Sequence, residues 1–522
     1  MTHRTSSLRL LAVLLPLLAS PLVTFRAPAA VLPLEEIPVE SPLYLSLEDL
    51  ATRYGAPSGF LSTRPWTLAD ANALLDALAR SASGCESDPA FVRVRREIAR
   101  AAPDTPLRLS SGDSAAVEIS PYVRLGYRED RTQAPAVVRD DRIGAAVAAD
   151  LRGRALLFAD YYAATWSPGP HGNPIAGSRF ALVEGSEFTQ WIDRAFVAVG
   201  AGALSVRAGH TWLRWGPGRS GTLGLSDAAR ALDLVEMRWR LLPAAQLTWF
   251  VAWLDPLKES HLAGHRLEIR ASPSLSLGVA ELARFDGSAH MPQYLVPVVG
   301  FNLREKQISR FSDTSADTQQ AFSKNNVLWT TDITWRIRPG LAVSGELMID
   351  DFSFSSAWRP TEIGWQLGGR ASRRIGARDA AGARAEYTRI YNFTYSTWHR
   401  HDFEDAGLPL AYPFGPDVEM LLAEFEWNRG PDWTFVCSAS RLQKGEGRIG
   451  VPWFPAQGKV EAIPLSGVVE RTGRASLSAS FRPGRRLAVT GEVGRVEVRN
   501  LDHTRGVSTG RWFGSCLLTV RW

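Results

Sequence analysis

The sequence contains few cysteines and, after its first 29 residues, no long apolar run. The three cysteines among 522 residues, Cys85, Cys437 and Cys516, are odd in number and far apart, and no C-x-x-C motif occurs. This pattern predicts neither a disulfide framework nor a zinc site. No later stretch reaches the roughly 18 consecutive apolar residues of a membrane-spanning helix. A mature chain in a membrane would therefore have to form a closed barrel, since in lipid only helices and closed barrels satisfy every backbone polar group.

The sequence also lacks clustered basic charge, and its short motifs lack the context that enzymes require. The net charge is +5, but the excess comes almost wholly from arginines spread along the chain, which argues against a nucleic-acid partner. The Gly-x-Ser-x-Gly pattern occurs once, at Gly506-Val507-Ser508-Thr509-Gly510, but it leads into the predicted final strand Trp512–Trp522 and not into the helix that follows a nucleophile elbow. The segment Gly216-Pro217-Gly218 lacks the following Lys-Ser/Thr of a phosphate-binding loop, so it indicates a turn.

Two groups of residues raise the question of catalysis or metal binding, namely Asp350-Asp351 and His399-x-His401-Asp402. Adjacent residues on a strand point to opposite faces, so only one of the two aspartates can line a lumen. The histidines have no further His or Cys ligand nearby in the sequence, which favours a solvated loop. We therefore expect no enzyme activity, no cofactor and no metal site.

The first 29 residues have the features of a cleaved secretory signal. Arg4 and Arg9 precede an apolar run that begins at Leu10, and the small-residue pattern Ala27-Pro28-Ala29 follows. A retained membrane anchor is the alternative, but prolines interrupt a stretch that is already short for a spanning helix. We expect cleavage after Ala29 or Ala30 and export of residues 30–522.

Residues 30–110 are predicted to form short amphipathic helices that act as a periplasmic plug or docking segment. Capping-box spacing occurs at Ser46/Asp49 and Thr67/Asp70, and Asp88-Pro89 places a cap before a proline at the first helical position. Two apolar stripes follow at helical spacing, Leu68, Ala71, Leu74, Leu75 and Leu78, and then Phe91, Val94 and Ile98. Between the first two helices lies Arg64-Pro65-Trp66, whose Trp66 should pack onto them.

Residues 111–522 are predicted to form an all-β transmembrane barrel. In Val235–Leu241 and Val327–Ile337 apolar and polar residues alternate, as a strand between lipid and a wet lumen requires. The 18 tryptophans fit the aromatic girdles of such a barrel. The first strand should lie near Val117, and the last, Trp512–Trp522, should close against it.

Eight tight turns alternate with longer polar stretches such as Ser309–Asn326, Thr397–Pro416 and Gln443–Ser466. Periplasmic turns are short and extracellular loops are long. Eight periplasmic turns, in a barrel whose first and last strands both have their chain ends in the periplasm, predict about 18 antiparallel strands. The turns are Arg152-Gly153, Gly200-Ala201-Gly202, Pro243-Ala244, Ser272-Pro273, Arg338-Pro339-Gly340, Gly376–Gly382, Gly430-Pro431-Asp432 and Arg482-Pro483-Gly484.

An ordered set of motifs in this chain resembles the Wzi family of capsule-assembly outer-membrane proteins. The motifs are Arg64-Pro65-Trp66, Trp212-Leu213-Arg214-Trp215-Gly216-Pro217-Gly218, Leu223–Arg230, Gly345–Asp351 and Tyr412-Pro413-Phe414-Gly415-Pro416-Asp417. The resemblance implies an 18-stranded barrel with an N-terminal helical plug that binds or organises surface polysaccharide without catalysis. The late loop Trp398–Asp405 departs from the family's Tyr-, His- and Gly-rich pattern, so the resemblance does not imply the same sugar.

The residue types themselves favour a polysaccharide partner. Sugar rings offer apolar faces, and many surface polymers carry carboxylates, so aromatic faces beside arginine forks suit them. Interfacial girdles and lumen ion pairs use the same residue types. The candidate binding residues are Trp212, Arg214, Trp215, Arg219, Arg389, Tyr391, Tyr395, Trp398 and Arg400, and the candidate loop or lumen motif comprises Gly216, Pro217, Gly218, Asp350, Asp351, Gly415, Pro416 and Asp417.

The sequence predicts a polysaccharide protein of the bacterial outer membrane and leaves its mode of action open. It would either attach surface polymer or export it, in the latter case as a secretion porin with a periplasmic export protein as partner. A general porin is the remaining alternative, although a porin would not need the helical segment. The expected partners are surface polysaccharide and outer-membrane lipid.

Overall fold

The computed structural model describes residues 34–99, 108–111, 115–130, 137–166, 188–255, 259–287, 292–297, 300–303, 325–351, 360–397, 401–458, 460 and 464–522. The predicted signal segment, residues 1–29, lies outside these. No helix among the described residues is long and apolar enough to cross a membrane.

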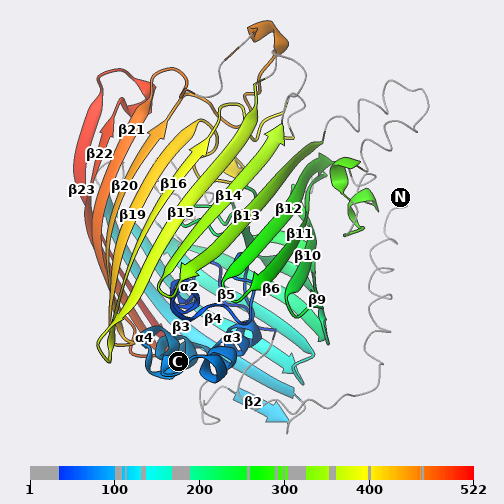
Figure 1. The fold of residues 1–522 in the computed structure, drawn as a ribbon, viewed down its shortest axis with the longest axis vertical. Coiled ribbons are helices and arrows are strands. Elements are labelled where there is room, and N and C mark those ends of the chain that lie inside the picture. The colour runs from blue at the N-terminus through cyan, green and yellow to red at the C-terminus, as the bar shows by residue number, and fades with distance from the viewer. Residues whose placement is uncertain are drawn as a thin grey trace.

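Eighteen antiparallel strands within the described residues close into one barrel, as predicted (Figure 1). They are β3 (Ala115–Asp130), β4 (Val137–Leu151), β5 (Ala155–Trp166), β6 (Phe188–Ala201), β7 (Leu204–Thr211), β9 (Leu232–Leu242), β10 (Ala245–Asp255), β11 (Ser260–Ser272), β12 (Leu275–Asp286), β13 (Asn326–Arg338), β14 (Leu341–Asp351), β15 (Glu362–Ile375), β16 (Asp379–Ile390), β19 (Val418–Arg429), β20 (Trp433–Lys444), β21 (Glu470–Phe481), β22 (Leu487–Arg499) and β23 (Ser508–Arg521).

The barrel closes between its first and last strands. β23 pairs with β3 from Phe513 to Arg521, and the N–H of Trp522 donates to the carbonyl of Pro121 at 3.0 Å. A short strand, β2 (Arg108–Ser111), pairs with the start of β3. The prediction that the C-terminal strand closes against a strand near Val117 is confirmed.

Side chains alternate between the two faces of the sheet. On β13, Trp329, Ile333, Trp335 and Ile337 are 41–46% exposed on the outer face, whereas the intervening Asp332 is buried. All eight tight turns lie at one end of the barrel, called here the short-turn end, and the longer connections lie at the opposite, long-loop end. The loosely bounded turn Gly376–Gly382 is shorter than predicted, because β16 already begins at Asp379.

Three helices precede the barrel, α2 (Leu43–Tyr54), α3 (Leu68–Ser81) and α4 (Pro89–Ile98). The capping box of Thr67 with Asp70 and the cap at Asp88 are confirmed. The predicted cap at Ser46 is wrong. α2 begins four residues earlier than a cap at Ser46 predicts, after Pro42, whose φ of −65° suits a helix start. The Ser46 hydroxyl is buried inside the helix, where it accepts a hydrogen bond from Arg93 at 3.3 Å.

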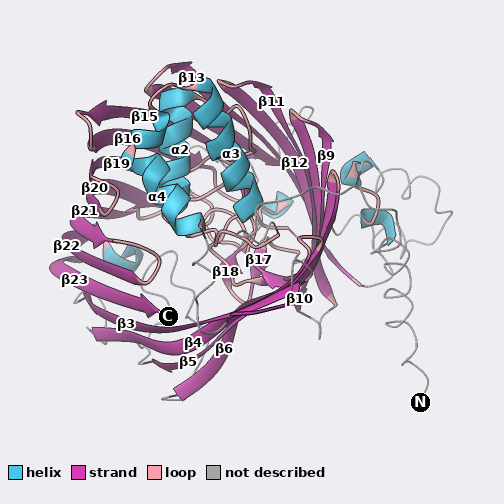
Figure 2. Cartoon of the chain, turned by 90° about the horizontal axis from the view of Figure 1, so that it is seen from below, coloured by secondary structure: helices cyan, strands magenta, loops and turns pink. Residues whose placement is uncertain are grey.

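The two predicted apolar stripes form one core between the helices, together with Trp66, Cys85 and residues of α2. Figure 2, which looks from the short-turn end, shows α2, α3 and α4 within the ring of strands. Backbone contacts hold them there: the N–H of Ala56 donates to Pro273, and the N–H of Gly340 donates to Thr52. Arg96 donates to the carbonyl of Arg482 at 2.6 Å. The helices thus plug the short-turn end and are called the plug below.

Candidate functional site

Two motifs that stand about 150 residues apart in the sequence meet inside the barrel. β1 (Thr63–Arg64) follows α2 in the plug, and β8 (Arg214–Trp215) lies in the long loop between β7 and β9. They pair as antiparallel strands, Thr63 with Trp215 and Arg64 with Arg214. The N–H of Gly216 adds a hydrogen bond to the carbonyl of Ser62 at 2.8 Å. A loop from the long-loop end therefore reaches down the lumen and joins the plug.

Aromatic and aliphatic side chains fill the lumen above this junction. Trp215 packs edge-on against Phe250 of β10, with ring centroids 5.2 Å apart. A second inward loop, between β16 and β19, contributes Tyr395, whose hydroxyl donates to the carbonyl of Leu223 at 2.8 Å. Trp215, Tyr395 and Tyr412 are at most 2% exposed and belong to one apolar cluster. These inward loops pack as an apolar core against the inner face of β9–β14, β16 and β19 and narrow the lumen there.

The glycines of Gly216-Pro217-Gly218 are required by this close packing. Gly216 has φ of 124°, a conformation that L side chains rarely adopt. A Cβ atom at Gly218 would lie 2.1 Å from both the Gln366 side-chain oxygen and the Gly221 carbonyl oxygen. The segment is a bend that presses against the barrel wall, and Pro217 lines a cavity beside it.

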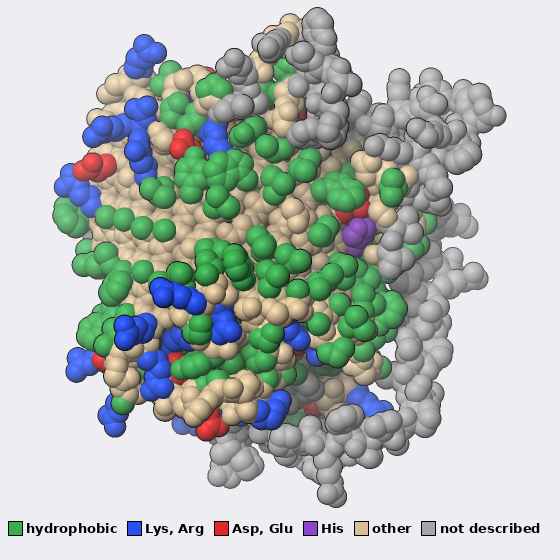
Figure 3. Space-filling model, viewed as in Figure 1, with side chains coloured by type: hydrophobic (Ala, Val, Ile, Leu, Met, Phe, Trp, Pro, Cys, Tyr) green, Lys and Arg blue, Asp and Glu red, His purple; other side chains and the backbone are tan. Residues whose placement is uncertain are grey.

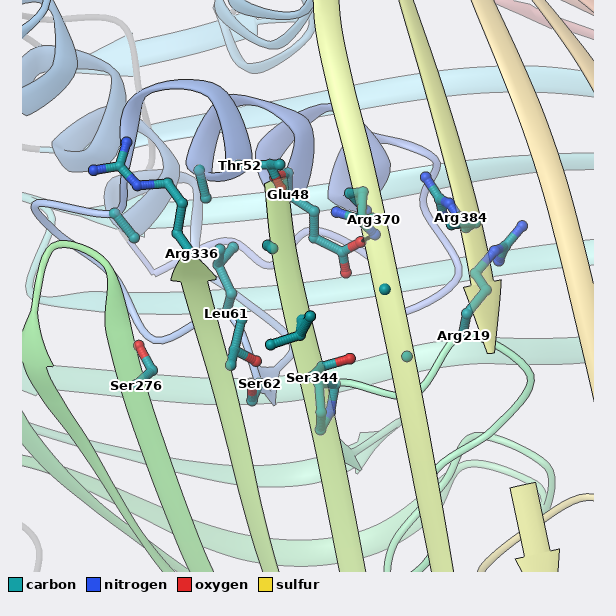
Figure 4. A pocket seen from close by; sticks show the side chains of 18 of the residues that line it. Glu48, Thr52, Leu61, Ser62, Arg219, Ser276, Arg336, Ser344, Arg370 and Arg384 are labelled. Atoms are coloured by element: carbon teal, nitrogen blue, oxygen red, sulfur yellow. Dashed lines mark hydrogen bonds and ion pairs between the residues drawn. The ribbon is translucent and has the colours of Figure 1, made fainter. Parts of the chain in front are cut away.

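That cavity, of about 110 Å³, lies between α2 and the wall formed by β11–β16 (Figure 4). Charged side chains line it, among them Glu48 of α2, Arg219 of the inward loop and Arg370 and Arg384 of the wall. Its volume suffices for several water molecules. Arg219 forms a two-pronged ion pair with Glu424, at 2.9 and 3.1 Å.

Glu48 is the central acid of the plug's contact with the wall. Its carboxylate accepts hydrogen bonds from Arg64 of β1 and from Arg370 of β15. Burial alone would raise the pKa of Glu48, but the two arginines, with Arg370 the stronger, lower it to about 2. The carboxylate therefore stays ionised and ties the plug to the barrel at any physiological pH.

Most of the predicted binding residues have structural partners. Trp212 and Trp215 are buried, and Arg214 bonds to Asp227 at 3.1 Å and to the Gly218 carbonyl. Arg389 is buried, with its guanidinium 5.7 Å from the Tyr391 ring. Trp398 and Arg400 lie outside the described residues. Nothing in these positions tests contact with a polymer, so the assignment of this set stays a prediction.

The motif residues also have structural partners. Asp350 accepts from the N–H of Tyr395 at 2.5 Å, whereas the Asp351 side chain lies outside the described part. Asp417, beside Gly415 and Pro416, is fully buried and accepts from the N–H groups of Gly447 and Ser466. Arg64 and Trp66 stabilise the plug, since Trp66 donates its indole N–H to the Phe60 carbonyl at 2.7 Å.

Sequence analysis did not single out the tip of the long-loop end. Between β20 and β21, before and at the short helix η4 (Pro455–Gln457), Val451 and Phe454 are 53% and 46% exposed, and Arg448 is exposed as well. Figure 1 shows this helix at the top of the molecule. The available signal was the tetrad Val451-Pro452-Trp453-Phe454, an apolar run in an otherwise polar loop. Phe454 is thus an exposed aromatic side chain beside this helix, and Arg448 is an exposed basic one earlier in the same loop.

The described residues show no metal-binding cluster, because no group of three or more His, Cys, Asp or Glu side chains among them is placed to hold a metal ion. His401 instead pairs with Asp286 at 3.0 Å across two loops.

Comparisons with known proteins give a family match and several similar barrel structures. A family model described as capsule assembly protein Wzi matches residues 141–509, more than two thirds of the chain. Curated protein sequences give no significant match. Among solved structures, Wzi of Escherichia coli, described as an outer membrane protein involved in group 1 capsule assembly and a carbohydrate-binding β-barrel, is 15% identical with a TM-score of 0.63, over 93% of this chain and 99% of that one. OprD of Pseudomonas aeruginosa is 9% identical with a TM-score of 0.43, over 78% of this chain and 95% of that one.

Proposed function

Because this chain belongs to the Wzi family of capsule assembly proteins and forms an outer-membrane β-barrel, we propose that it holds surface polysaccharide at its extracellular face. In this role it attaches the polymer to the cell and catalyses no reaction. The short-turn end then faces the periplasm and the long-loop end the exterior. We assign residues 1–29 to a cleaved signal, 30–110 to the plug and 111–522 to the barrel.

The observation that supports the proposal is the obstruction of the lumen by the plug and the inward loops. A conduit needs a lumen that opens, and the pairing of β1 with β8 ties the plug to an extracellular loop inside the barrel. Opening would require breaking this pairing, the two bonds of Glu48 and the apolar cluster around Trp215 together. Attachment requires none of these changes, so it fits the obstructed barrel better than export or general diffusion does.

The loop tip offers the type of surface that attachment requires. Phe454 presents an apolar face of the kind on which sugar rings pack, and Arg448 provides a fork for carboxylates. Arg219 and Tyr391 are the less buried of the predicted binding residues. Arg219 lies on the lumen side, and Tyr391 lies at the base of the loop after β16. We propose the tip as the first contact of an acidic polysaccharide.

The test is binding of the host's own surface polysaccharide to the purified full chain. The double variant Phe454→Ala/Arg448→Gln should bind at least tenfold more weakly than the wild type. The control is Leu303→Ala, which removes an even more exposed apolar side chain, 68% against 46% for Phe454, from another extracellular segment. Equal binding by all three proteins would contradict a role for the tip.

Export with a periplasmic partner is the second candidate. It is supported by the exposed periplasmic side of the plug, where Asp76 and Arg95 form an ion pair with both side chains about half exposed. Such a surface is available to a partner protein. Polysaccharide-dependent opening of single channels in a planar bilayer would favour export; a bilayer that stays closed would favour attachment.

A further inference from the structure

Four arginines gather on the outer face of the barrel near its extracellular end. They are Arg441 of β20, Arg471 of β21, and Arg495 and Arg499 of β22, and all four are exposed. Figure 3 shows one group of basic side chains at the upper left, over the extracellular ends of these strands, and a second group along the lower part of the molecule. The register of the strands explains the cluster. Arg471 lies directly opposite Arg499, and the next outward residue of β21, Gly473, lies opposite Arg441.

These arginines share the face that meets lipid. They point to the same face of the sheet as Leu477 of β21 and Val493 of β22, which are 61% and 52% exposed. Inward-facing neighbours such as Val496 and Val498 are buried. The cluster is therefore part of the membrane-facing surface, not of the lumen.

The position of these arginines along the barrel axis matches the extracellular edge of the apolar belt. Strand residues rise about 3.3 Å each and barrel strands tilt by about 40°, so ten residues climb about 25 Å, the height of the belt. Arg471 lies ten residues above Phe481, whose ring packs 4.6 Å from that of Trp433 at the periplasmic edge. Arg499 lies ten residues above Val489, the outward partner of Phe481. Both guanidinium groups thus reach the level of the outer-leaflet headgroups.

The charges in the cluster are poorly compensated. Glu497 pairs with Arg495 at 2.8 Å, with both side chains about half exposed. Arg471 and Arg441 share only the amide oxygen of Gln443, at 3.3 and 3.5 Å. Arg499 makes no hydrogen bond or ion pair with the described residues. The cluster therefore keeps an excess of positive charge with free donors.

Glycines leave room for a ligand between the arginines. Gly473 lies outward between Arg441 and Glu497 in the register, and a Cβ there would meet no atom within 4 Å. Elsewhere the outward positions toward the extracellular ends carry aromatic side chains, such as Trp253 of β10 and Trp329 of β13. On β20–β22 basic side chains beside open space thus take the place of the aromatic girdle, and Trp512 of β23, whose ring lies 6.0 Å from the Arg495 guanidinium, borders the cluster.

We propose that this surface binds the phosphorylated headgroup of a glycolipid in the outer leaflet. Guanidinium groups pair with phosphate through two parallel hydrogen bonds, and the ligand's acyl chains would lie on the apolar face around Leu477 and Val493. A lipid is favoured over the surface polymer because the cluster continues directly into lipid-facing side chains. This inference depends on the barrel's place in the outer membrane and not on the binding of polysaccharide.

The test compares two double variants of the full chain in detergent, each lacking two outward arginines. Arg471→Gln/Arg499→Gln changes the cluster. Arg373→Gln/Arg429→Gln removes two exposed outward arginines from the periplasmic ends of β15 and β19 and serves as the matched control. Heat-modifiable gel mobility verifies that each variant folds. The probes are diphosphoryl lipid A, the same lipid without phosphates, and inorganic phosphate.

Wild type and control should bind diphosphoryl lipid A equally, and Arg471→Gln/Arg499→Gln should bind it at least tenfold more weakly. The lipid without phosphates should bind all three proteins weakly and alike. Equal binding of diphosphoryl lipid A by both double variants would overturn the proposal. Displacement of lipid A by equimolar inorganic phosphate would also overturn it, since the site would then take any free anion. The proposal would also be overturned if Arg471 and Arg499 were needed to bind acidic polysaccharide and not to bind lipid.

Discussion

Replacing Glu48 by glutamine should loosen the plug from the barrel wall. The carboxylate accepts from Arg64 and Arg370, and its pKa lies at about 2 instead of the ordinary 4.5. A fall of about 2.5 pH units, at about 1.36 kcal/mol per unit, gives about 3 kcal/mol of stabilisation at neutral pH. The Glu48 side chain is only 15% exposed, so solvent screening reduces this little. The variant leaves Arg64 and Arg370 poorly paired, and because the lowered pKa reflects the same interaction, the expected loss stays at about 3 kcal/mol.

Cys85 provides the assay, because it is a native thiol buried in the plug's core. In a background with Cys437 and Cys516 changed to alanine, a water-soluble maleimide reports transient opening of the plug. Local opening that is easier by about 3 kcal/mol should raise the labelling rate on the order of 100-fold. The matched control is Arg240→Gln, which breaks an exposed plug-to-wall pair with Asp70 and should raise the rate less than about fivefold.

The pH dependence gives a second readout with a defined sign. Because folding lowers the pKa of Glu48, its stabilisation is present above about pH 4.5 and is lost as the pH falls toward 2. Pepsin cleavage of the wild-type plug should therefore accelerate over this range, and Glu48→Gln should flatten the dependence. Labelling of Cys85 at the same rate in wild type, Glu48→Gln and Arg240→Gln would refute the reasoning.

Three further changes test the packing that obstructs the lumen. Gly218→Ala places a Cβ 2.1 Å from the Gly221 carbonyl oxygen and should cost about 1–3 kcal/mol, seen as a lower midpoint of thermal unfolding; an unchanged midpoint would contradict the close packing. Asp417→Ala removes the acceptor for the loop N–H groups of Gly447 and Ser466, about 2–3 kcal/mol, and should speed trypsin cleavage at Arg448 by about 30- to 100-fold. Thr67→Ala removes half of the α3 capping box, about 1 kcal/mol, and should raise Cys85 labelling about fivefold, whereas no change would show that the cap contributes nothing.

The strands, turns and two of the three helix starts followed from local patterns in the sequence. The alternation around Asp332 and the tight turns each depend on residues a few positions apart, so a single segment contains the information. The start of α2 did not follow, because Ser46 has the chemistry of a cap but uses its hydroxyl for a tertiary contact with Arg93. Local capping signals cannot reveal such a contact.

The candidate site depended on contacts that sequence spacing cannot show. Girdle, core and sugar-binding positions all use Trp and Tyr, so the burial of Trp215 and Tyr395 in the lumen was not predictable from composition. The arginines on β20–β22 were judged to be spread along the chain, yet the register of the sheet brings Arg441, Arg471 and Arg499 together. Long-range pairing determines both features.

The most direct test of attachment by an obstructed barrel is the partition of surface polysaccharide between cells and medium in a strain that lacks this protein. If the barrel attaches polymer, the deletion strain should make normal total amounts, lose polymer from the cell surface and release it into the medium, and the wild-type gene should restore the surface layer. If the polymer is instead absent from both surface and medium, the barrel is needed for export, and attachment by an obstructed barrel is contradicted.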